Sequence, residues 1–114
     1  MAERAEGMII VSTRLLFQQR RQIAEFVAHN RVPAAGGWGD WTKDGLLLTY
    51  GPNTAQSMRR IATYVDKVLK GARPGDLAFE RPIKFDLVLN LKAAKSLGLT
   101  IAETLISRAD EVIE

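Results

Sequence analysis

The sequence has no cysteine and only one histidine. Without cysteine, disulfide scaffolds, thiolate metal sites and cysteine nucleophiles are excluded. One histidine is too few for an ordinary transition-metal site, and Asp40 and Asp44 lack the further ligands of a calcium loop. His29 lies near the end of a predicted helix, where the helix dipole favours a cation, so we interpret it as a capping residue. We therefore predict no metal, no cofactor and no catalytic residue.

Long apolar runs are also missing from the 114 residues. The N-terminus is polar, and the first apolar run, residues 8–11, is too short for an export signal or a membrane span. We expect no signal peptide in the chain as written. The net charge of +3 is small, and its lysines and arginines are scattered among acidic residues. Without a basic face or interleaved aromatics, this pattern does not favour nucleic-acid binding.

What the sequence does contain is an alternation of short apolar runs and amphipathic segments. Its apolar fraction of 46% and charged fraction of 25% are those of an ordinary globular domain. We predict strands at residues 8–11, 32–35, 46–50 and 83–91, and helices at 16–30, 54–70, 92–97 and 100–109. Strands that alternate with helices indicate an α/β fold with a doubly wound, mostly parallel, Rossmann-like sheet.

The candidate ligand-binding residues follow the first three predicted strands, because ligands of such sheets bind beyond the carboxyl ends of the strands. Aromatic rings there can stack on a flat ligand, small residues leave room, and helix N-termini can hold a carboxylate. The same residues also have simpler interpretations, since tryptophans at loop ends can plug the core and hydroxyl or amide groups can cap helices. The candidates are Ser12, Thr13, Gly36, Trp38, Tyr50, Gly51 and Asn53.

A nucleotide-binding loop is the competing interpretation of the glycines. Gly37, Gly39 and their neighbours lack the third glycine of the dinucleotide motif, and Trp38 is bulky for close approach to a pyrophosphate. A small nucleotide-dependent enzyme domain of Rossmann type remains the alternative function. A stand-alone dimeric interaction domain is a third.

Two segments resemble the C-terminal signature of bacterial ABC-transporter substrate-binding proteins: residues 64–77 and 82–101. The most specific part is Lys84 to Lys92, residues 108–114 are similar to the tail of the family, and the loop from Tyr50 to Asn53 matches its interlobe loop. The resemblance extends from Gly7 to Glu114. Ala35 to Gly39 departs from the family pattern, which puts the size of the pocket in doubt, and Ile101-Ala102 replaces a common Ile-Pro.

This resemblance implies one part of a two-lobed, type I periplasmic binding fold, in a branch linked to amino acids. Residues 1–80 would form the second lobe, and residues 81–114 would cross back to a first lobe that the chain lacks. The ligand would lodge between the lobes, and a membrane permease would recognise the closed form. The family is periplasmic, whereas the chain as written would be cytoplasmic. We further expect self-association through the strand at residues 83–91, because its apolar face would lack its usual sheet.

Overall fold

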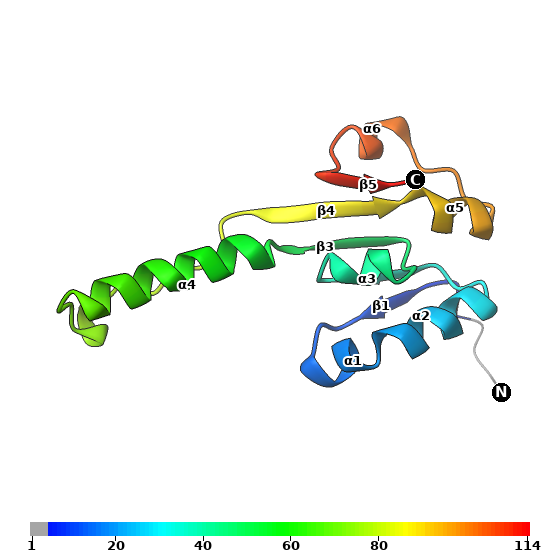
Figure 1. Ribbon diagram of the computed structural model, residues 1–114. Helices are drawn as coiled ribbons and strands as arrows, with labels where there is room; N and C mark the ends of the chain where they lie inside the picture. Colours follow the sequence, from blue (N-terminus) through cyan, green and yellow to red (C-terminus); the bar gives the residue numbers. More distant parts are fainter. Residues whose placement is uncertain (1–4) are drawn as a thin grey trace.

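The computed structural model describes residues 5–114, which form a five-stranded sheet with helices and one long projecting segment (Figure 1). Residues 1–4 belong to the polar N-terminus on which the expectation about an export signal rested, and they lie outside the described residues. The elements are β1 (Met8–Ile10), α1 (Arg14–Gln18), α2 (Arg20–His29), β2 (Ala34–Gly36), α3 (Asp40–Lys43), β3 (Leu48–Pro52), α4 (Thr54–Leu69), η1 (Pro74–Asp76), β4 (Phe85–Asn90), α5 (Leu91–Leu97), α6 (Glu103–Ile106) and β5 (Glu111–Ile113).

The strands lie in the order β1-β2-β3-β4-β5. The pairs β1–β2, β2–β3 and β4–β5 are parallel, so the predicted α/β fold with a mostly parallel sheet is confirmed. The pair β3–β4 is antiparallel, with a register that runs from Leu48 opposite Leu89 to Pro52 opposite Phe85. The sequence pattern did not indicate this reversal or the short strand β5.

Strand β4 is bonded along both edges, to β3 and to β5. Leu89 of its expected apolar face is buried, whereas Ile83 and Phe85 of the same face are exposed, so the expectation that this face lacks its usual sheet stays a prediction. Self-association through residues 83–91 stays a prediction, with no free edge for it in β4. The assignment of residues 81–114 to a segment that crosses to another lobe also stays a prediction, and here the segment joins the common sheet.

The core lies on one face of the first three strands. Ile10 of β1 is buried with Val27 of α2, Trp41 of α3 and Leu46, while its neighbour Ile9 is 85% exposed. Successive strand residues point to opposite faces. Helices α2 and α3 therefore cover the Ile10 face, and the Ile9 face of β1 is open.

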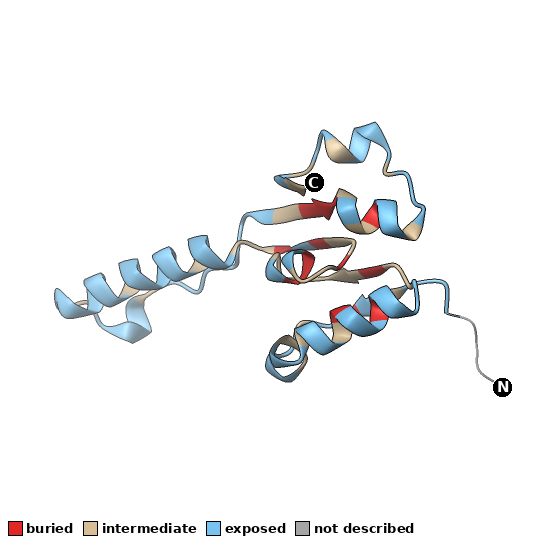
Figure 2. Ribbon diagram, turned by 45° about the vertical axis from the view of Figure 1, so that its right-hand side comes forward, coloured by how far each residue is buried: buried red, intermediate tan, exposed pale blue. Residues whose placement is uncertain are grey.

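Residues 54–84 project from the sheet, and we call them the arm (Figure 1). Helix α4 begins after the cap Asn53 and ends before Gly71, whose φ of 102° is the left-handed conformation that favours glycine at a helix end. The chain then returns beside the helix, where the Tyr64 hydroxyl donates to the Ala78 carbonyl at 2.6 Å. All residues of α4 are exposed or half-buried (Figure 2).

Two helix predictions need correction. The helix expected over residues 16–30 is two helices, with Gln19 as the C-cap of α1 and the N-cap of α2. The last helix is a single turn that begins at Glu103, and its N-cap is Ala102 rather than the predicted Thr100. Among residues 5–114, no helix has the length and apolar character needed to cross a membrane.

Candidate functional site

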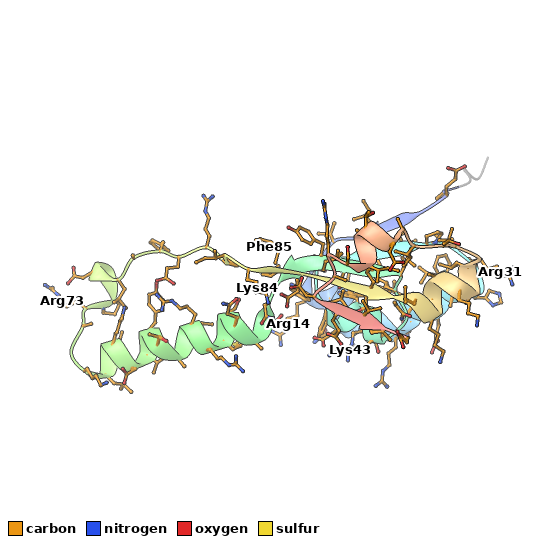
Figure 3. The ribbon with its side chains drawn as sticks, turned by 90° about the horizontal axis from the view of Figure 1, so that it is seen from above. Arg14, Arg31, Lys43, Arg73, Lys84 and Phe85 are labelled. Atoms are coloured by element: carbon orange, nitrogen blue, oxygen red, sulfur yellow. The ribbon has the colours of Figure 1, made fainter. Side chains whose placement is uncertain are left out.

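One edge of the sheet collects every loop that we predicted to bind a ligand. Strands β1, β2 and β3 are parallel, so their carboxyl ends meet there, and antiparallel β4 adds its amino end. We call this end of the sheet the ligand edge, as distinct from the hydrogen-bonding edges of single strands. Figure 3 shows Lys84 and Phe85 at the junction between this edge and the arm, with Arg73 at the arm's far end.

The centre of the ligand edge is a tight contact between two glycines. A Cβ atom on Gly51 would lie 1.6 Å from the Gly37 carbonyl oxygen, and one on Gly37 would lie 2.7 Å from Ser12 Oγ. Neither position accepts a side chain without movement of its neighbour. The Ser12 hydroxyl is buried and has no hydrogen-bond partner among the described residues. Its bonding capacity is therefore unused.

Thr13 and Asn53 cap α1 and α4, which begin at the ligand edge. The side-chain oxygen of Thr13 accepts from the Leu16 amide at 3.3 Å, and that of Asn53 accepts from the Gln56 amide at 2.7 Å. The Asn53 amide group also donates to Asp86 Oδ2 at 2.5 Å. Both side chains thus have the simpler role that the sequence left open. The first backbone amides of α4 still face the ligand edge, as at any helix N-terminus.

Tyr50 and Phe85 form an aromatic pair next to the ligand edge, on the face of the sheet that Ile9 shares. Their rings stack with centroids 5.7 Å apart and planes inclined by 27°. Tyr50 lies opposite Leu87 in the register, so Phe85 is its diagonal neighbour on the same face of the sheet. Tyr50 is 62% exposed. It therefore offers a free ring face for stacking.

The tryptophans pack inward. Trp38 is half-buried, and its ring meets the edge of Phe17 with centroids 5.1 Å apart. Trp41 is fully buried in the core. A Cβ atom on Gly36 would lie 3.4 Å from the Trp41 ring, so Gly36 makes room for this tryptophan. Gly36 and Trp38 therefore lie near the ligand edge, as predicted, but their contacts there are packing contacts with Trp41 and Phe17.

A charged cluster at the ligand edge was missed by the sequence reasoning. Lys84 Nζ lies 3.6 Å from Asp86 Oδ1 and 3.7 Å from Asp110 Oδ1. Asp110 Oδ2 also accepts a hydrogen bond from the Leu87 backbone amide at 2.9 Å, which links the start of β5 to β4. In the sequence, the cluster is visible only as the alternation of polar residues over residues 84–90. This pattern does not place Lys84 and Asp86 at the ligand edge until β4 is known to run antiparallel to β3. Residues 5–114 contain no cluster of three or more potential metal ligands.

Comparisons with known proteins identify the family and the fold of the chain. The sequence model of one family, ABC transporter substrate binding protein, matches residues 1–113. No curated protein sequence matches the chain at a significant level.

Three solved structures share the fold. A conserved domain protein from Vibrio cholerae is 24% identical with a TM-score of 0.89, over 95% of this chain and 36% of that one. An ABC domain in complex with L-Trp from Streptococcus pneumonia is 20% identical with a TM-score of 0.90, over 96% and 37%. A ligand-free, open substrate binding protein with adhesive properties from Clostridium difficile is 16% identical with a TM-score of 0.63, over 92% and 35%. The chain thus spans little more than a third of these relatives.

Proposed function

Because the chain belongs to the family of ABC transporter substrate binding proteins, we propose that its ligand edge forms half of a binding site for an amino acid with an aromatic or apolar side chain. The observation that carries this proposal is the exposed ring of Tyr50, which stacks on Phe85 and lies in the strand that leads through Gly51 to the N-terminus of α4. The ligand's side chain would stack on Tyr50, and its carboxylate would accept from the first amides of α4.

The buried Ser12 hydroxyl supports a polar contact in the same half-site. It lies beside Gly37, whose missing side chain leaves the hydroxyl within reach of the ligand edge. An unused buried hydroxyl has a cost that a ligand group can remove. A relative that was solved with L-Trp bound supports an amino acid as the class of ligand.

The transport role follows from the same proposal. The chain covers 36% and 37% of two structures whose fold it shares, so the other wall of the site would belong to a part that these relatives possess. A ligand that contacts both walls would stabilise the closed arrangement by its higher affinity for it. The closed form would then deliver the ligand to an ABC permease, with the binding step in the periplasm and without any bond being broken.

Calorimetric titration tests the half-site directly. The chain is titrated with L-Trp, L-Phe, L-Leu, L-Ser and D-Trp at millimolar concentrations, since half a site binds weakly. We expect heat from the aromatic and apolar L-amino acids and much less from L-Ser and D-Trp. Absence of binding to every amino acid, or saturable binding of ATP or NAD instead, would overturn the proposal in favour of the nucleotide-dependent alternative.

A further inference from the structure

Asn90 is a buried polar residue at the point where β4 ends and α5 begins. It is 6% exposed and lies in the buried end of β4 that Figure 2 shows in red. Its side-chain oxygen accepts from the Ala93 amide at 2.8 Å, and its side-chain nitrogen donates to the Thr42 carbonyl at 2.8 Å. Ala93 belongs to α5 and Thr42 to α3, so one side chain both caps α5 and links it to α3.

Thr42 continues this link toward the ligand edge. Its backbone amide donates to the Gly39 carbonyl at 3.2 Å, and its hydroxyl donates to the same oxygen at 2.5 Å. Thr42 is fully buried, so water does not compete for these bonds. Gly39 is two residues after Gly37, whose carbonyl oxygen lies against Gly51. A chain of hydrogen bonds therefore runs from Asn90 to the segment that makes the central contact of the ligand edge.

We infer that Asn90 is a positioning residue for ligand binding, which acts through Thr42 on the loop of residues 37–39. The inference rests on the proposed function, because Gly37 and the neighbouring Ser12 belong to the proposed half-site. A binding site loses affinity when its groups must be ordered by the ligand, so contacts that fix the loop beforehand increase affinity.

The loop needs such a contact because α3 is too short to fix it. The helix has four residues, and a single helical turn has no stability of its own. Trp41 holds α3 on the sheet by its burial in the core, but apolar burial is not directional. A hydrogen bond restricts both distance and angle. The bond from Asn90 therefore sets where α3 lies along the sheet, and α3 sets the loop that precedes it.

Asn90→Ser separates the two roles of this side chain. Serine is a good helix cap, so α5 keeps its first turn, whereas the serine side chain is too short to reach the Thr42 carbonyl. Ala94→Gly is the matched control. Ala94 is buried in α5, and glycine there should lower the free energy of unfolding by about 1 kcal/mol while the bond from Asn90 to Thr42 stays in place.

The position of the loop is read from nuclear Overhauser effects between the α-protons of Gly37 and Gly51. The Gly37 Cα lies 3.2 Å from the ideal Cβ position of Gly51, so these protons are close in the wild type. Asn90→Ser should weaken the effects, and Ala94→Gly should leave them unchanged. In calorimetric titration, Asn90→Ser should weaken binding of L-Trp about three- to tenfold, the range that one hydrogen bond contributes. Ala94→Gly should change it less than about twofold.

Thr42→Val is a second, independent variant. It keeps the size of the side chain and removes the hydroxyl that donates to Gly39, so it should shift the Overhauser effects and the L-Trp affinity in the same direction as Asn90→Ser. Circular dichroism checks that each variant is folded.

Three results would overturn the inference alone: unchanged Overhauser effects in either Asn90→Ser or Thr42→Val, equal changes in Ala94→Gly, or wild-type affinity for L-Trp in Asn90→Ser. A wild type that binds no amino acid would overturn the proposed function as well, so the two failures are distinguishable.

Discussion

The carbonyl oxygen of Gly37 occupies the place where a side chain on Gly51 would begin, 1.6 Å from the ideal Cβ position. This contact joins the end of β2 to the end of β3 at the ligand edge. We predict that Gly51→Ala forces the two strand ends apart and lowers the free energy of unfolding by about 2 kcal/mol or more, as overpacking does. Urea denaturation measures this loss.

Gly75→Ala is the matched control, because a Cβ atom at Gly75 meets nothing within 4 Å. It should change the free energy of unfolding by less than about 0.5 kcal/mol. Equal stability of the two variants would show that the close approach of Gly37 and Gly51 is not maintained in solution.

Asn53 links the arm to the sheet by capping α4 and by donating to Asp86. Asn53→Ala removes the cap and leaves a half-buried carboxylate without its amide donor. We expect a loss of about 2 kcal/mol in the free energy of unfolding, more than a cap alone contributes. Thr13→Ala, which removes the exposed cap of α1, should cost about 1 kcal/mol or less. Similar losses for both variants would mean that the bond to Asp86 contributes nothing.

Tyr50 tests the stacking half of the proposed ligand site. Tyr50→Ala should weaken binding of L-Trp about three- to tenfold, the range that an aromatic pair contributes, while Tyr50→Phe should retain it. Phe26→Ala is the control, since Phe26 is an exposed aromatic on α2. Calorimetry gives the dissociation constants. If the Phe26 and Tyr50 variants to alanine behave alike, Tyr50 does not contact the ligand.

We predict that docking of the returning segment on α4 depends on pH, because Arg60 of the helix bonds the Glu80 carboxylate of that segment. Its pKa falls from the ordinary 4.5 to about 2, chiefly because Arg60 donates hydrogen bonds to it, with smaller contributions from Tyr64 and Lys67. A carboxylate with a lowered pKa in the folded protein stabilises it above the ordinary pKa, and the contribution is lost as the pH falls from about 4.5 to about 2.

The contact between the Tyr64 ring and Ala78, followed by nuclear Overhauser effects at several pH values, reports this docking. We expect these effects to weaken below pH 4.5 and to be weak in Glu80→Gln already at pH 6. Glu103→Gln on α6 serves as the control and should match the wild type. Unchanged Overhauser effects in Glu80→Gln would contradict the prediction.

The alternation of strands and helices was predictable because local periodicity determines it. Helix α4 is the best example, since its apolar stripe, its cap Asn53 and Gly71 at its end are all encoded locally. The direction of β4 was not predictable, because a strand has the same period of two whichever way it runs. Strand β5 has only three residues, too few for a period to show.

The candidate site was predictable only in its position. The rule for parallel sheets predicted that Ser12, Gly51 and Tyr50 lie at or near one end of the sheet, where the structure has them; that they bind a ligand stays a prediction. It could not show that Asn53 caps a helix while it also holds Asp86, nor that Phe85 lies against Tyr50. Those contacts depend on the register between β3 and β4, which no local pattern encodes.

The two ends of the arm lie side by side. The backbone N–H of Asn53 donates to the Lys84 carbonyl at 3.3 Å, next to the last β3–β4 pair, Pro52 and Phe85. In terms of connectivity, the arm is an oversized hairpin turn between neighbouring strands. The sheet needs only a short tight turn at this place. The arm is therefore a detachable module, and a chain in which a two-residue turn replaces residues 54–83 would retain the sheet, its register and the Tyr50–Phe85 stack.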